Sequence, residues 1–167
     1  SARIVSYASI VVLIITLILV GIITDGRTLT FGGAFVSDTF GLFIKTLVLI
    51  ASSATILISR DYLIMHGINR FEFPVLIILA TLGMLMMVSA NDLISLYLGL
   101  ELQSLSLYVI AAFQRDSTRS AEAGLKYFVL GALASGILLY GLTLEYGFSG
   151  TTNFDSLAKL FTSENVD

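Results

Sequence analysis

Five long apolar stretches restrict this chain to very few folds. An α-helix needs about 20 apolar residues to cross the hydrocarbon core of a bilayer, which is the length of these stretches. Lipid offers the backbone no hydrogen bonds, so only helices or closed barrels can span it. Only 13% of the residues are charged, against about a quarter in soluble domains. We therefore expect an all-α integral membrane protein with about five transmembrane helices.

Polar and turn-forming residues mark where the predicted helices begin and end. Residues 25–27, Asp-Gly-Arg, end the first apolar stretch with turn chemistry. Pro74 suits the first turn of the third helix, where its missing N–H leaves no bond unmade. Asn91 and Asp92 can cap the fourth. The predicted helices are 4–24, 38–59, 74–90, 92–113 and 119–145, followed by a polar tail at 146–167 with a short amphipathic helical segment at 154–161.

Arginine and lysine are divided unevenly between the two ends of these helices. Short cytoplasmic loops normally carry an excess of both residues. One end carries Arg3, Arg60, Arg70, Arg115 and Arg119, whereas the other carries Arg27, Lys45 and Lys159. We therefore expect Ser1 to face the cytoplasm or the mitochondrial matrix. No internal repeat divides residues 1–167, so they are interpreted as a single transmembrane domain.

Composition argues against several kinds of partner. The chain has no cysteine and one histidine, His66, so neither a thiolate site nor a cluster of imidazole ligands is available for a metal. A formal net charge of −3 provides no basic surface for nucleic acid. We expect no bound cofactor or metal, no nucleic-acid partner, and lipid around the helices.

Glu101 lies near the middle of the fourth predicted helix, too deep to reach water easily. A charge at that depth costs roughly 2.5–3.5 kcal/mol on insertion scales, so such a carboxylate normally faces protein or a water-filled cavity. Tyr97, Ser104 and Tyr108 fall on the same helical face. This polar face favours a proton relay, and the alternative is a hydrogen bond that only locks the packing of two helices.

Lys126 is the ionisable residue of the fifth predicted helix, and its partner is open at this stage. Its depth allows an ion pair with Glu101 across the two helices. Glu122, one turn earlier on the same helix, is at the spacing that favours a Glu–Lys pair. In the first case Lys126 belongs to the relay, and in the second it extends towards the membrane surface.

Small residues on the fifth helix indicate close helix packing. Gly131 and Ser135, and likewise Ala132 and Gly136, have the small-xxx-small spacing that lets a neighbouring helix approach. We interpret these residues as packing surfaces and not as a binding site.

Three segments resemble one protein family. They are LGLELQSL around Glu101, EAGLKY around Lys126, and YGFSGTTNF at 146–154. The region 71–154 that contains them closely resembles the NuoN subunit of respiratory complex I, called NADH dehydrogenase subunit 2 in mitochondria. The family fold is a larger antiporter-like bundle. Glu101 matches a glutamate on the fifth helix of that bundle, whereas it lies on the fourth predicted helix of this chain. The resemblance therefore implies an N-terminal portion that lacks the family's first helix.

The resemblance also implies a function. It suggests a proton-translocating, non-redox subunit of NADH:ubiquinone oxidoreductase in the bacterial cytoplasmic or mitochondrial inner membrane, with Glu101 and Lys126 in a relay. NADH, FMN, iron–sulfur clusters and quinone would then bind to other subunits, and the partners would be neighbouring antiporter-like and small membrane-arm subunits. The alternatives are a subunit of a cation/proton antiporter or membrane hydrogenase, and a structural scaffold or assembly subunit.

Overall fold

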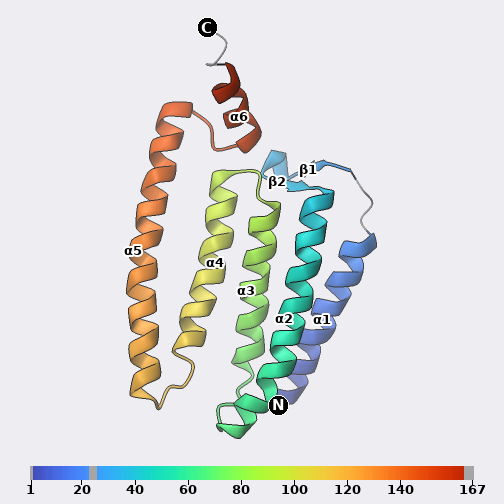
Figure 1. Ribbon diagram of the computed structural model, residues 1–167, viewed down its shortest axis with the longest axis vertical. Coiled ribbons are helices and arrows are strands. Elements are labelled where there is room, and N and C mark those ends of the chain that lie inside the picture. Colours follow the sequence, from blue (N-terminus) through green and yellow to red (C-terminus); the bar gives the residue numbers. More distant parts are fainter. Residues whose placement is uncertain (1, 23–25, 164–167) are drawn as a thin grey trace.

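The structure, a computed structural model, describes residues 2–22 and 26–163. Five of its helices are long and apolar enough to cross a membrane, which confirms the predicted fold class. They are α1 (Ala2–Ile22), α2 (Thr39–Met65), α3 (Glu72–Ser89), α4 (Leu93–Ala111) and α5 (Thr118–Ser149). Figure 1 shows them side by side in the order of the sequence, with consecutive helices running in opposite directions. Each helix packs against the next, and the contact between α3 and α4 is the most extensive.

Short polar side chains cap these helices. Asp38 precedes α2, and its carboxylate accepts a hydrogen bond from a backbone N–H in the first turn. The Asp92 carboxylate does the same for α4, as the sequence predicts, and the Ser117 hydroxyl oxygen accepts the corresponding bond for α5. At its other end α5 stops at Gly150, which has a left-handed φ of 69° that glycine adopts without steric penalty.

Two helices extend beyond their predicted ends. Helix α2 continues from 59 to Met65, so Arg60 lies in its last turns and not in a connecting loop. There Arg60 donates a hydrogen bond to the Tyr7 hydroxyl (2.6 Å), and its guanidinium lies 5.0 Å from the centre of that ring. Helix α5 continues to Ser149. The predicted end of the first helix at 24, the turn residue Asp25 and the side of the membrane that Ser1 faces lie outside the described residues.

A small β-hairpin occupies the connection that the sequence presents only as a glycine-rich loop. Strands β1 (Thr28–Thr30) and β2 (Phe35–Ser37) pair antiparallel, with the single turn η1 (Phe31–Gly33) between them. Gly32 and Gly33 have positive φ angles of 66° and 91°. Glycine permits this tight reversal because it has no Cβ.

Asn91 joins the hairpin to the rest of the chain. Its side chain is buried and donates hydrogen bonds to the Gly33 carbonyl and the Asp155 carboxylate, both at 3.0 Å. Asn153 donates to the same Gly33 carbonyl and to the Asn91 carbonyl, both at 3.1 Å. Arg27 pairs with Asp155 at 2.6 Å. This capping network fixes the start of the short helix α6 (Phe154–Ser163) above the bundle (Figure 1).

The two ends of the bundle therefore differ in chemistry. We call the end with β1, β2 and α6 the hairpin end (Figure 1). We call the opposite end, where α2 connects to α3 and α4 to α5, the arginine end, because it carries Arg60, Arg70, Arg115 and Arg119. The division of arginines between the ends thus follows the predicted one.

The small core lies between α1, α2 and α3. Leu13, Leu49 and Ile56 are buried there, and Thr81 donates a hydrogen bond to Ser52 (2.7 Å) from α3 to α2. Most apolar side chains instead point outward, and none in the most apolar stretch of α5 is buried. These surfaces require lipid or further helices around them.

Candidate functional site

The polar face of α4 packs against α5. The Tyr97 hydroxyl lies 2.9 Å from the Ser135 hydroxyl of α5. The Tyr108 ring meets the Tyr127 ring edge-on at 4.8 Å, and its hydroxyl occupies the space that a Cβ at Gly131 would fill. Both tyrosines predicted to support the site therefore contact α5.

Glu101 lies on α4 between these two tyrosines. It is one turn from Tyr97, and Ser104 continues the same face one turn further on. The Glu101 side chain is half-buried, and its Oε1 atom is buried with no hydrogen-bond partner among the residues that the structure describes. A buried polar atom without a partner costs about 1–3 kcal/mol, and more when it is charged. Within the described residues, the contact between α4 and α5 therefore leaves this oxygen without a donor.

Lys126 pairs with Glu122, not with Glu101. Its Nζ lies 2.6 Å from Glu122 Oε1, and the two side chains are 70% and 60% exposed. The rotation of α5 explains the choice. Gly124 faces the C-terminal end of α4, where an added Cβ would overlap the Cβ of the capping residue Ala112. Lys126 follows two residues later, roughly 200° around the helix at 3.6 residues per turn, and so points away from α4.

Glycines decide how closely α4 approaches both neighbours. A Cβ at Gly83 of α3 would lie 2.6 Å from the Gly99 carbonyl oxygen of α4. The sequence reasoning missed this contact, whose only signal is one isolated glycine in each of two apolar stretches. Of the small residues expected to pack, Gly131 and Ser135 do face α4, whereas Gly136 has no atom near its missing side chain.

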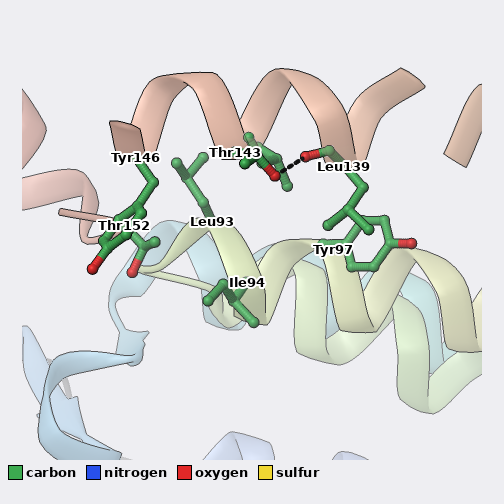
Figure 2. A pocket seen from close by; sticks show the side chains of 8 residues that line it. Leu93, Ile94, Tyr97, Leu139, Thr143, Tyr146 and Thr152 are labelled. Carbon is green, nitrogen blue, oxygen red and sulfur yellow. Dashed lines mark hydrogen bonds between the residues drawn. The ribbon is translucent and has the colours of Figure 1, made fainter. Parts of the chain in front are cut away.

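A cavity of about 200 Å³ lies between α4 and α5 at the hairpin end. Figure 2 shows Tyr97 and Leu139 at one side of it and Tyr146 and Thr152 at the other. Its two threonine hydroxyls already have acceptors: Thr143 donates to the Leu139 carbonyl at 2.8 Å, and Thr152 donates to an aspartate. A water molecule needs two to four polar partners, so this cavity suits apolar groups better.

The remaining titratable groups lie towards the helix ends. Hydrogen bonds from Arg27 and then Asn91 hold the pKa of the Asp155 carboxyl below its usual range. His66, at the end of α2, has Nδ1 3.0 Å from the Tyr62 carbonyl oxygen. Within residues 2–22 and 26–163, no three His, Cys, Asp or Glu residues gather as a metal site would require.

Comparison with known proteins shows what the chain resembles. Residues 90–167 match the family model described as NADH:quinone oxidoreductase/Mrp antiporter, transmembrane. The NADH-quinone oxidoreductase subunit N of Parvibaculum lavamentivorans is 64% identical over 138 residues, which are 83% of this chain and 29% of that protein. Over most of its own length, this chain is similar to NADH-quinone oxidoreductase subunit N. The subunit N of Paramagnetospirillum magneticum is 56% identical over 96% of this chain and 33% of its own length.

Chains of two solved respiratory membrane complexes have a similar fold. A chain of Thermus thermophilus respiratory complex I with bound aureothin superposes with a TM-score of 0.77 at 31% identity, over 91% of this chain and 33% of that chain. An archaeal membrane-bound sulfane sulfur reductase has the same fold, with a TM-score of 0.77 at 23% identity, over 93% of this chain and 34% of that one. The predicted resemblance is confirmed, and the protein is a multi-pass membrane protein. This chain spans about a third of the length of the relatives it matches.

Proposed function

We propose that this chain contributes to proton translocation in the membrane arm of respiratory complex I, with Glu101 as the group that takes up and releases the proton. One observation carries the proposal: a carboxylate in the middle of α4 has a buried oxygen with no partner in the described ranges. Ionisable groups at membrane depth are rare and typically mark proton or ion pathways.

The surroundings of Glu101 suit a proton carrier. A carboxyl in dry surroundings is more stable when protonated, and one that meets water or a cation is more stable when ionised. In this proposal, water or a positive charge that reaches Oε1 is what couples Glu101 to the proton path. Tyr97, held at 2.9 Å from Ser135, keeps α5 against α4 beside the carboxyl, and Ser104 and Tyr108 supply further hydroxyls on the same face.

In this proposal, the electrostatic effect of Lys126 on Glu101 depends on whether Lys126 is paired with Glu122. While Lys126 is paired with Glu122, the two charges largely cancel at the distance of α4. When the pair opens, the uncompensated positive charge of Lys126 favours the ionised form of Glu101. In this proposal the exposed ion pair acts electrostatically on the half-buried Glu101 side chain, and the two groups need no direct contact.

The rest of the assignment follows from the family. We assign NADH, flavin, iron–sulfur and quinone chemistry to other subunits, so that this chain has a non-redox role in the enzyme. Neighbouring membrane-arm subunits are the proposed partners, which agrees with the outward-facing apolar side chains of α5. The arginine end is assigned to the cytoplasm or matrix from the distribution of arginines.

The test replaces Glu101 by Gln in the complete complex and measures NADH-driven acidification of proteoliposomes alongside NADH oxidation. We expect the number of protons pumped per NADH to fall while the complex still assembles. Glu145→Gln is the matched control, because it makes the same change near the C-terminal end of α5. This variant is expected to pump normally. Normal pumping by an assembled Glu101→Gln complex would reject the relay, and failure of assembly alone would favour the scaffold role.

A further inference from the structure

A second cavity, of about 310 Å³, lies at the arginine end between the start of α3 and the end of α4. Arg70, Glu72 and Arg115 line it where the two helices end, and Val75, Leu76 and Val109 line it one or two turns further into the helices. The cavity thus combines a charged rim with an apolar interior. Its level along the helices is that of lipid headgroups, because it lies where the apolar segments stop.

The three charged side chains of the rim do not satisfy one another. Among the residues that the structure describes, neither the Arg70 nor the Arg115 guanidinium forms an ion pair. Glu72 lies in the same cavity, yet its Oε2 atom is buried and has no hydrogen-bond partner within the described part of the chain. The cavity therefore presents two cationic donors that lack an anion and one acceptor that lacks a donor.

We propose that this cavity binds the headgroup of phosphatidylethanolamine. The lipid phosphate accepts hydrogen bonds from Arg70 and Arg115, since guanidinium groups match phosphate oxygens in geometry and charge. The lipid ammonium donates to Glu72 Oε2, and an acyl chain follows the apolar wall at Val75 and Val109. Basic pockets between transmembrane helices are known to bind the phosphates of lipid headgroups such as those of cardiolipin and phosphoinositides.

The unpartnered Glu72 oxygen selects among phospholipids. The choline headgroup has the same phosphate, but its trimethylated nitrogen has no N–H to donate. The glycerol headgroup has hydroxyl donors but no cation to neutralise a carboxylate, and charge-assisted hydrogen bonds are roughly twice as strong as neutral ones. The ethanolamine headgroup supplies both an anion and a cationic donor. This site is independent of the role of Glu101, which lies in the middle of the membrane on the face of α4 that meets α5.

The experiment uses the intact membrane assembly that contains this chain. After delipidation it is titrated with phosphatidylethanolamine, phosphatidylglycerol or phosphatidylcholine of identical acyl chains, and native mass spectrometry measures the lipid retained. We expect Arg70→Gln/Arg115→Gln to weaken retention of phosphatidylethanolamine about tenfold or more, the size expected for losing charge-assisted hydrogen bonds. Arg119→Gln removes one positive charge from an exposed position at the same end but outside the cavity, and is expected to bind phosphatidylethanolamine normally.

Glu72→Gln separates the ethanolamine assignment from general attraction of anions. It is expected to weaken binding of phosphatidylethanolamine and to leave phosphatidylglycerol unchanged or tighter. Equal retention of phosphatidylcholine and phosphatidylethanolamine by the unmodified assembly would overturn the proposal. The proposal would also be overturned if the double arginine variant retained as much phosphatidylethanolamine as Arg119→Gln. The same holds if Glu72→Gln left the affinity for phosphatidylethanolamine unchanged. Size-exclusion chromatography and NADH oxidation of each variant establish that the assembly is intact.

Discussion

Replacing Gly83 by Ala tests the contact that sets the position of α4. The added Cβ would lie 2.6 Å from the Gly99 carbonyl oxygen and 2.7 Å from the Gln103 backbone nitrogen. Ordinary contact begins near 3.4 Å, so the approach is about 0.8 Å too close. Both atoms belong to the backbone and cannot rotate away, so α3 and α4 must separate. Because Glu101 follows Gly99 by two residues, this separation also displaces the candidate site.

The expected cost is that of an overpacked interface, roughly 1–3 kcal/mol. Alanine also gains roughly 0.8–1.0 kcal/mol of helix propensity over glycine, which hides part of this cost. Gly136→Ala is the matched control, because it gains the same propensity where no atom lies within 4 Å. Titration of the purified protein with a denaturing detergent should show Gly83→Ala to be less stable than Gly136→Ala by roughly 1–3 kcal/mol. Equal stability of the two variants would refute the close approach of α3 and α4.

Three further predictions test other contacts. Tyr97→Phe and Ser135→Ala should each destabilise the protein by about 1 kcal/mol, and the double variant should lose little more, because both remove one hydrogen bond. Asn91→Ala should increase protease cleavage of the hairpin several-fold, since it removes the buried donor to the Gly33 carbonyl. The lowered pKa of Asp155 means that its stabilisation is complete above the unfolded value of 3.8 and is lost as pH falls through the folded pKa. Wild type and Asp155→Asn should therefore differ in thermal stability near neutral pH and converge in acid; a difference that persists unchanged in acid would contradict this ion pair with Arg27.

Several features could be predicted because local sequence decides them. The length of an apolar stretch determines whether a helix can span the bilayer, and residues such as Asp92 and Pro74 limit where helices begin. The depth of Glu101 follows from its position within its own helix. Its alignment with Tyr97, Ser104 and Tyr108 follows from helical periodicity alone. Their role in proton transfer stays a prediction.

The remaining features depend on contacts between segments distant in the chain. The hairpin was missed because strands of three residues are stabilised by what they dock on, here the bridge from Phe35 to Ala90 and the donors of Asn91. The close approach of α3 to α4 needs two glycines that meet only in the folded protein.

Lys126 shows where sequence alone stops and tertiary structure decides. The sequence shows that Lys126 is one helical turn from Glu122 and at a depth close to that of Glu101. Each of these positions permits an ion pair. Which pair forms depends on the rotation of α5 about its own axis. Contacts of Gly124 and Gly131 with α4 set that rotation, and it turns Lys126 outward to Glu122. The sequence by itself therefore determined five membrane helices and a mid-membrane carboxylate. Only packing decided which charges meet, because a helix carries its side chains on every face and its neighbours select one.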